Sequence, residues 1–376
     1  MNVPKIRFNG FNEEWQETKL CDIAKITMGQ SPNSENYTND SNDTLLIQGN
    51  ADLNNGKVIP RLFTKQITKT CDRNDIIMTV RAPVGDIAIS EYNACIGRGV
   101  CSIKSSKFVY HYLDYLKMKD YWKKISKGST IDSITSDDIK SLLIKTPNKK
   151  EEEKIIKTVD LINKKIELQS KKIEDLKLFK KGLFDKLDFK NYKNVKLKDI
   201  LNEVNIKSTI NNQYEILSST SNGLFLQKDY FNKQAASENN IGYKIIKKDQ
   251  LVLSPQNLWM GNININFKYK EGIVSPSYKI YDINTNIIDI DYFNNWIKSP
   301  RALYEYMISS EQGASVVRRN LNIDLFDEII LKLPDISEQK RIGRQIKNIN
   351  KKIELEFKKL DKLKELKKGL MQNMFV

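Results

Sequence analysis

Apolar residues recur at the spacing of one helix face in two long stretches of the chain. Intervals of four and three residues alternate in both stretches, which is the pattern of a coiled-coil seam. The seam positions are Ile155, Val159, Ile162, Ile166, Ile173, Leu176 and Leu183, and then Ile342, Ile346, Ile349, Ile353, Leu360, Leu363 and Leu370. Polar residues interrupt it at matching places, namely Gln169, Lys180, Glu356 and Lys367. Each stretch of about 36 residues predicts a rod of roughly 54 Å.

Both predicted helices have a start signal. Asn148 is followed three residues later by Glu151, and Asp335 is followed in the same way by Glu338. This is the spacing of a capping box, in which the first residue caps the helix and the glutamate bonds back to the cap. The sequence therefore predicts that the helices begin at matching positions.

The two helical stretches are copies of one segment. The motif INKKIEL begins at residue 162 and again at residue 349, and KKGL follows in both copies in the same register. Aligning 151–184 with 338–371 gives 17 identical residues out of 34. A repeat at a fixed offset indicates a repeated architecture. The chain is thus predicted to alternate a variable unit, a fixed helix, a second variable unit and a second fixed helix.

The variable segments have the pattern of mixed α/β domains. Short β-rich runs lie between loops rich in Asn, Gly, Ser and Pro, and a helical stretch closes each unit near 108–126 and 290–309. The clearest strands are 75–80, 86–90, 250–254 and 278–283. We expect an α+β protein with two mixed α/β domains joined by two long antiparallel helices in a pseudo-two-fold internal repeat. The predicted parts are 1–147, 148–188, 189–334 and 335–376.

The charge of the chain favours a polyanionic partner without proving one. The 376 residues carry a net charge of +15, but only ten of the 62 basic residues are arginine. Nucleic acid is the commonest partner of such a chain, whereas a lysine-rich, Asn- and Ile-rich composition is also typical of an AT-rich genome. The helical stretches 149–187 and 336–376 carry +4 and +7 of the charge. They either run near DNA or present solvated lysine faces.

No leader, membrane span or metal motif is recognisable. No apolar run reaches the roughly 18 residues of a membrane span, and the start of the chain lacks a signal-peptide pattern. The four cysteines form no CxxC pair, so no zinc site is expected. We expect a cytoplasmic protein with free, mostly buried thiols.

The chain also lacks recognisable catalytic motifs. It contains no Pro-Pro motif of an amino-methyltransferase, and GNADLNNGKV departs from a phosphate loop in its spacing and in having no Ser or Thr after Lys57. Asp335, Glu338 and Lys340 resemble a nuclease motif but lie within one helix start, where capping explains the carboxylates. His111, the single histidine, lies in an apolar helical stretch and is expected to be packed or exposed rather than catalytic.

Without a recognisable catalytic motif, the side chains of interest are those that could bind DNA. Arginine matches guanine, asparagine and glutamine match adenine, and lysine grips phosphate. The candidate DNA contacts are Lys57, Arg61, Arg81, Arg98, Ser129 and Thr130 in the first unit, and Gln256, Asn257, Lys279, Arg318 and Arg319 in the second. For each one a solvated surface role is the alternative. Apolar side chains outside the seam are candidates for binding partner subunits, the alternative being contact with the chain's own units. They are Leu168, Phe179, Leu355 and Leu366.

The order of variable unit and helix resembles the specificity subunit of type I restriction-modification systems. The units open near Lys19 and Lys196 and close with the glycine-containing segments 128–134 and 313–321. The entries to the helices, at Pro147 and Pro334, also match the family. One departure is that Glu152 stands where the second copy has the more usual Gln339.

The resemblance implies a non-catalytic subunit whose two target recognition domains each bind half of a split sequence in double-stranded DNA. Two modification subunits would dock on the helices and methylate adenine, and restriction subunits, where present, would translocate and cleave the DNA using ATP. S-adenosylmethionine, ATP and Mg would then belong to the partner subunits, with no cofactor in this chain. The other hypotheses are a coiled-coil tether, a nuclease acting through Asp335, Glu338 and Lys340, and a free-standing DNA-binding regulator.

Overall fold

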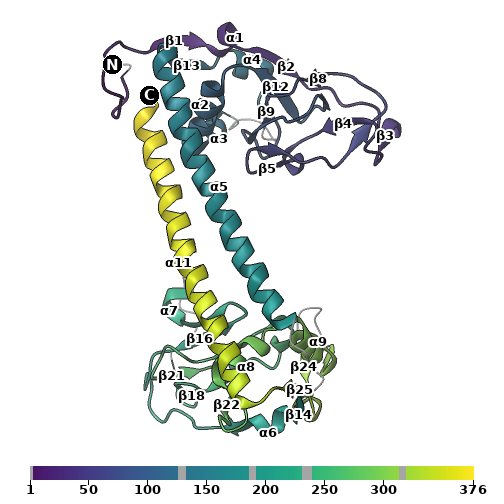
Figure 1. Ribbon diagram of the computed structural model, residues 1–376, viewed down its shortest axis with the longest axis vertical. Helices are drawn as coiled ribbons and strands as arrows, with labels where there is room; N and C mark the ends of the chain where they lie inside the picture. Colours follow the sequence, from purple (N-terminus) through teal and green to yellow (C-terminus); the bar gives the residue numbers. More distant parts are fainter. Residues whose placement is uncertain (1–2, 126–132, 186–191, 231–238, 313–318) are drawn as a thin grey trace. The chain divides into compact units, whose positions relative to one another are not determined.

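The computed structural model describes residues 3–125, 133–185, 192–230, 239–312 and 319–376. The chain divides into two compact units, the first formed by 1–172 with 357–376 and the second by 173–356. Each is a mixed α/β unit with parts of two long helices, which confirms the predicted fold class (Figure 1).

The first unit is built on two small sheets (Figure 1). Its described elements are β1 Gln16–Lys19, α1 Leu20–Ile23, β2 Lys25–Met28, β3 Tyr37–Thr38, β4 Thr44–Ile47, β5 Leu53–Asn54, β6 Lys57–Val58, β7 Phe63–Thr64, β8 Thr70–Cys71, β9 Ile76–Thr79, β10 Ile87–Ile89, β11 Ala94–Ile96, β12 Val100–Lys104, α2 Lys107–Met118, α3 Tyr121–Ile125, α4 Ser136–Lys140 and β13 Leu143–Thr146. One sheet has the strand order β2-β12-β9-β10-β6-β5 and the other β3-β7-β4-β11-β8. Strands β9, β11 and most of β12 are buried because they are continuous apolar runs.

The second unit repeats this plan with fewer strands in its main sheet. Its described elements are β14 Lys193–Lys196, α6 Leu197–Ile200, β15 Leu201–Val204, β16 Leu217–Thr220, β17 Gly223–Leu226, α7 Gln227–Tyr230, β18 Lys244–Lys247, β19 Leu251–Leu253, β20 Ile263–Ile265, β21 Glu271–Val274, β22 Lys279–Ile283, α8 Ile290–Trp296, α9 Pro300–Ile308, β23 Ser310–Gln312, β24 Arg319–Leu321, α10 Ile323–Asp327 and β25 Ile330–Leu333. Its main sheet has the order β15-β22-β19-β20, which matches β2-β12-β9-β10 in the first unit.

The helical stretch predicted near the end of each variable segment is present and consists of two helices, α2 with α3 and α8 with α9. In the first unit Asp120, with a φ of 54°, separates α2 from α3. In the second unit Pro300 starts α9 after Ser299 caps it through the backbone N–H of Ala302. Proline has no N–H to continue a helix, so it favours a new start.

The two long helices are α5, Lys149–Asp185, and α11, Ile336–Met374. Within the first unit the start of α5, at Ile155 and Val159, shares a core with the end of α11, at Met371. Within the second unit the end of α5, at Leu183, packs with the start of α11, at Ile342. The helices are therefore antiparallel in each unit, and the predicted seam positions are buried or half-buried in both.

Asn148 and Asp335 cap the two helices as predicted, accepting hydrogen bonds from the N–H groups of Glu151 (3.0 Å) and Glu338 (2.9 Å). The glutamate half of the predicted capping box differs. The carboxylate of Glu151 is buried and accepts two hydrogen bonds from Arg7, at 2.7 and 2.8 Å, and one from Trp15. This contact raises the pKa of the Arg7 guanidinium.

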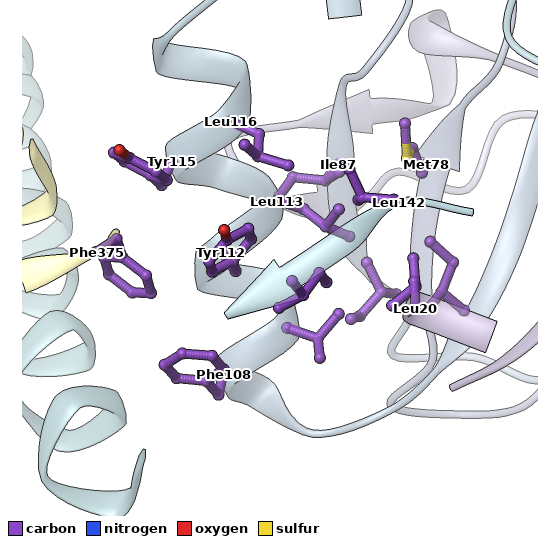
Figure 2. Packing of buried hydrophobic residues seen from close by; sticks show 14 of the residues in the cluster. Leu20, Met78, Ile87, Phe108, Tyr112, Leu113, Tyr115, Leu116, Leu142 and Phe375 are labelled. Carbon is purple, nitrogen blue, oxygen red and sulfur yellow. The ribbon is translucent and has the colours of Figure 1, made fainter. Parts of the chain in front are cut away.

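The end of α11 completes an aromatic cluster in the first unit (Figure 2). The Phe375 ring lies 5.5 Å from Phe108, 5.6 Å from Tyr115 and 5.9 Å from Tyr112, measured between ring centroids. The Tyr112 hydroxyl also donates to the carbonyl oxygen of Val376 at 3.0 Å. Residues separated by more than 250 positions therefore form one core.

Candidate nucleic-acid interface

Three loops of the first unit converge on a hollow of about 540 Å³. The loops follow strands β4, β9 and β11, and a fourth segment after β2 completes the wall. The lining residues are Ser31, Pro32, Ser34, Tyr37, Gln48, Gly49, Asn50, Arg81, Ala82, Arg98 and Gly99. Two of the predicted DNA contacts, Arg81 and Arg98, thus line one hollow, and no acidic residue lines it with them.

Backbone hydrogen bonds tie these loops together. The N–H of Gly97 donates to Ile47 at 2.8 Å, which joins the β11 loop to the end of β4. The N–H of Val80 donates to Gly99 at 2.9 Å, which joins the β9 loop to the other side of Arg98. Arg98 itself donates its backbone N–H to the Ser31 hydroxyl at 3.1 Å. The positions of the two arginines are therefore set by main-chain contacts.

Glycines make this close approach possible. A Cβ atom at Gly99 would lie 2.1 Å from the carbonyl oxygen of Gln48, and one at Gly29 would lie 2.1 Å from that of Gly97. Both distances are far inside van der Waals contact. Larger residues at these two positions would separate the loops that carry Arg98 and Gln48.

The guanidinium groups of Arg81 and Arg98 are exposed and form no hydrogen bond or ion pair with the described residues. The other basic candidates of this unit differ. Lys57 contacts Glu167 on α5 at 3.4 Å, and Arg61 donates to the carbonyl oxygen of Ala51 at 2.9 Å. An unpaired arginine in a hollow without carboxylates is suited to bind an anion or the guanine edge.

The corresponding loop of the second unit carries amides. Gln256 and Asn257 lie three and four residues after the end of β19, the strand that matches β9, and their side chains form no hydrogen bond with the described residues. The backbone is fixed, because Gln256 accepts from the N–H of Arg319 at 3.2 Å. The loop between β21 and β22, which matches the Arg98 loop, contains Pro276 between two serines. No arginine takes the place of Arg81 or Arg98 there.

A buried polar network supports the β16–β17 hairpin beside these loops. The Asn264 amide donates to the Ser219 hydroxyl at 2.7 Å and to the carbonyl oxygen of Thr220 at 2.8 Å. The amine of Lys298 donates to Asn264 Oδ1 at 2.7 Å and to the carbonyl oxygen of Ser221 at 2.9 Å. Burial lowers the pKa of Lys298. Sequence patterns alone gave no indication of this network.

Two other candidate DNA contacts of the second unit, Lys279 and Arg319, form contacts within the protein. Lys279 forms an ion pair of 2.6 Å with Glu203 on the neighbouring strand. Arg319 donates from Nε to the Ser310 hydroxyl at 2.9 Å and from its terminal nitrogen to the carbonyl oxygens of Ser310 and Met307. Ser129, Thr130 and Arg318 lie outside the described residues. DNA contact by any candidate remains a prediction.

His111 is fully buried on α2, where Nε2 lies 3.0 Å from Asp160 Oδ1 on α5. A carboxylate can only accept, so Nε2 carries the proton of the neutral ring. Nδ1 has no partner among the described residues, and burial lowers the pKa of His111 to about 4 despite the opposing effect of Asp160. His111 is therefore a packed residue, as expected.

The carboxylates of the nuclease-like motif are occupied by the helix start. Asp335 caps the helix and accepts from the Ser337 hydroxyl, while Glu338 accepts two hydrogen bonds from Arg341. Among the described residues, no group of histidine, cysteine, aspartate and glutamate side chains is placed to hold a metal ion. Cys21 is exposed, and Cys71, Cys95 and Cys101 are buried free thiols.

The four predicted partner-binding residues are exposed on the helices. Leu168, Phe179, Leu355 and Leu366 retain 50–59% of their accessible surface. Leu161, 65% exposed, lies on the same face of α5 as Leu168, since seven residues make almost two turns. These side chains are not used by the core of either unit.

Comparison with known proteins relates part of the chain to a family. Residues 12–178 match the family model described as the type I restriction modification DNA specificity domain. In Methanocaldococcus jannaschii, the putative type I restriction enzyme MjaX specificity subunit is 36% identical over 183 residues, covering 46% of this chain and 43% of that protein. The MjaIX specificity subunit of the same organism is 27% identical over 199 residues, covering 48% and 46%. The alignments thus span less than half the length of these relatives.

Solved structures share the fold along the whole chain. The S subunit of a type I restriction-modification system from M. genitalium has a TM-score of 0.61 at 17% identity, covering 100% of this chain and 99% of that one. A chain from a structural study of assembly and conformational transition in the type I system has a TM-score of 0.56 at 14% identity, covering 98% and 99%. Residues 12–178 therefore match the type I specificity domain, and the whole chain shares the fold of a solved S subunit. None of the described helices is long and apolar enough to cross a membrane.

Proposed function

We propose that this chain is the DNA-recognition subunit of a type I restriction-modification complex and that its two units bind the two halves of a split target. The observation that carries the proposal is the hollow of the first unit, which Arg81 and Arg98 both line and where neither side chain forms a hydrogen bond or ion pair with the described residues. The second unit supports it, because the same strand ends carry Gln256 and Asn257 instead. Two domains that bind different half-sites need different loop side chains, and here such side chains lie on a shared strand order.

The chemistry of the complex belongs to partner subunits in this proposal. S-adenosylmethionine, ATP and Mg would be bound by modification and restriction subunits, and this chain would position them on DNA. The relatives named as specificity subunits support this division. So do the residues that might have suggested catalysis, since Asp335 caps a helix and His111 is buried and neutral.

The exposed apolar side chains of the long helices are proposed to bind the two modification subunits. Leu168→Glu with Leu355→Glu should weaken assembly, because a carboxylate would be placed in an apolar contact. Leu178→Glu is the matched control, since Leu178 is 66% exposed but lies about 100° around α5 from Phe179. Co-purification of folded variants measures the effect. Unchanged stoichiometry in the double variant would refute this assignment.

Methylation-site sequencing of the host genome with and without the gene tests the proposed function. We expect a split adenine-methylated motif that disappears on deletion and returns with the wild-type gene. A structural tether would leave a modified motif in place without this chain. A free-standing regulator would bind its DNA sequence tightly in the absence of any partner and leave methylation unchanged.

A further inference from the structure

Gln48 directly follows β4 and lines the same hollow as Arg81 and Arg98, with the Arg98 loop lying between the end of β4 and the loop that carries Arg81. Its backbone is held by Asp52, whose carboxylate accepts from the N–H of Gln48 at 2.8 Å and from that of Gly49 at 3.1 Å. Its side chain is half-buried, and the amide nitrogen donates to the Tyr37 hydroxyl at 2.7 Å. The glutamine is therefore fixed at both its backbone and its side chain.

The Tyr37 contact leaves a specific pair of atoms available on Gln48. A primary amide has two N–H donors and one carbonyl oxygen, and one donor is used by the tyrosine. When the hydrogen trans to the carbonyl oxygen makes the tyrosine contact, the cis hydrogen and the oxygen stay adjacent on one edge. Adenine presents the complementary acceptor N7 and donor N6–H in the major groove. None of the described residues that line the hollow is acidic, so no carboxylate among them competes for the remaining N–H of the amide.

The neighbours of Gln48 determine what surrounds such an adenine. Gly97 donates to the carbonyl oxygen of Ile47, the residue before Gln48, and Gly99 lies against the carbonyl oxygen of Gln48 itself. Arg98, between these glycines, is thus fixed relative to Gln48. Its free guanidinium presents two parallel donors that match guanine N7 and O6.

We infer that Gln48 selects adenine in the half-site bound by the first unit, that Tyr37 positions its amide, and that Arg98 and Arg81 bind guanine next to it. This inference rests on the proposed function. It goes beyond the proposed function because it assigns adenine to Gln48. It also predicts that one amide and two arginine side chains contact bases in the same half of the target.

The test uses the whole complex in the host strain, with the gene replaced by Gln48→Ala, Gln48→Glu or Tyr37→Phe. Gln16→Glu is the matched control, because it adds the same charge at an exposed position of the same unit outside the hollow. Genome-wide methylation gives the motif and the fraction of sites modified. Binding of the purified complexes to the wild-type motif and to single-base variants gives relative affinities.

In Gln48→Ala we expect the requirement for one A·T pair to relax, with affinity for the wild-type motif falling roughly 5- to 150-fold. Gln48→Glu should shift preference at that pair towards C·G, since a carboxylate accepts from cytosine N4. Tyr37→Phe should keep the motif and lower affinity by less. The altered pair should lie in the same half that responds to Arg98→Ala.

Two results would overturn the inference while leaving the proposed function intact. One is an unchanged motif and occupancy in both Gln48 variants. The other is a uniform loss of binding to all sequences, which would make Gln48 a structural or backbone-contacting residue. The absence of any split motif dependent on the wild-type gene would instead refute the proposed function. The variants keep the backbone contact to Asp52, and thermal unfolding of each purified chain checks that they fold.

Discussion

The two recognition units differ most where their frameworks are most alike. The strand order β2-β12-β9-β10 of the first unit corresponds to β15-β22-β19-β20 of the second, and both sheets have apolar central strands. At the end of the third strand in each order, however, the first unit has Arg81 and the second has Gln256. Loop side chains pack little against the core, so their chemistry can change without loss of stability. If the two units bind DNA as proposed, the framework positions the loops and the loops determine which DNA is bound.

A second contrast lies at the helix starts. The first unit buries the ion pair of Arg7 and Glu151, whereas the second buries Gln339, which accepts from the N–H of Asp289 at 2.9 Å and donates to backbone carbonyls. A buried ion pair needs both partners, because either charge alone would be unpaired in the core. A neutral amide can be satisfied by backbone groups. The helix start thus has the same register in both units but different buried chemistry.

Exchanging a whole recognition segment should have the largest effect. Replacing 19–127 by the matching region of another family member should change one half of the target completely and leave the other half as it was. The reciprocal exchange of 201–312 should do the opposite. Methylation mapping of both chimaeras decides this, and change in both halves, or in neither, would show that the units do not act independently.

The stability of the first unit should depend strongly on Phe375, which directly follows α11. Phe375→Ala removes a ring that packs against four aromatic residues, so we expect the free energy of unfolding to fall by about 3–5 kcal/mol. Phe357→Ala on α11, at a more exposed position, should cost much less. Chemical denaturation of both variants measures the difference, and equal losses would mean that the aromatic cluster does not stabilise the unit.

Acid should destabilise the first unit through His111. The folded pKa of about 4 lies below the unfolded value near 6.5, so the unfolded chain binds the proton first. The contribution of neutral His111 to the free energy of unfolding is fully present above about pH 6.5. It is lost as the pH falls towards 4, and the loss amounts to roughly 3 kcal/mol at most. Asp160 and Asp114 favour the charged ring and Lys107 opposes it.

His111→Gln keeps a donor for Asp160 and removes the titration. Thermal unfolding between pH 7 and 4 should therefore show a smaller loss for His111→Gln than for the wild type. Parallel curves for the two proteins would contradict the assigned pKa.

The smallest expected effects are changes in specific DNA binding when single basic residues are replaced. They should differ between basic residues that have an ion-pair partner and those that have none among the described residues. Arg81→Ala or Arg98→Ala should each cost about 1–3 kcal/mol of specific binding and relax one position in one half of the target. Lys279→Ala should leave the motif unchanged, because Lys279 is paired with Glu203. Affinity measured on the wild-type and single-base-variant duplexes tests this. A motif altered by Lys279→Ala but not by either arginine substitution would reverse the assignment.

The sequence by itself determined the parts of the molecule that repeat. Helix periodicity is local, so the seam from Ile155 to Leu183 and the caps at Asn148 and Asp335 could be predicted from neighbouring residues. Strands β9, β10, β19 and β22 also followed from short apolar runs. The resemblance of the whole order of parts then gave the family, which the domain match at 12–178 supports.

Only the tertiary structure decided which side chains share a site. Gln48, Arg81 and Arg98 are far apart in the chain, and their convergence depends on hydrogen bonds such as Gly97 to Ile47 between separate strands. Tertiary structure also decides which basic residues form ion pairs. The carboxylates of Glu167 and Glu203 pair with Lys57 and Lys279 from elements that are distant in the sequence. Charge and residue type are properties of the sequence, but whether a charge is paired depends on non-local packing, which a local pattern does not encode.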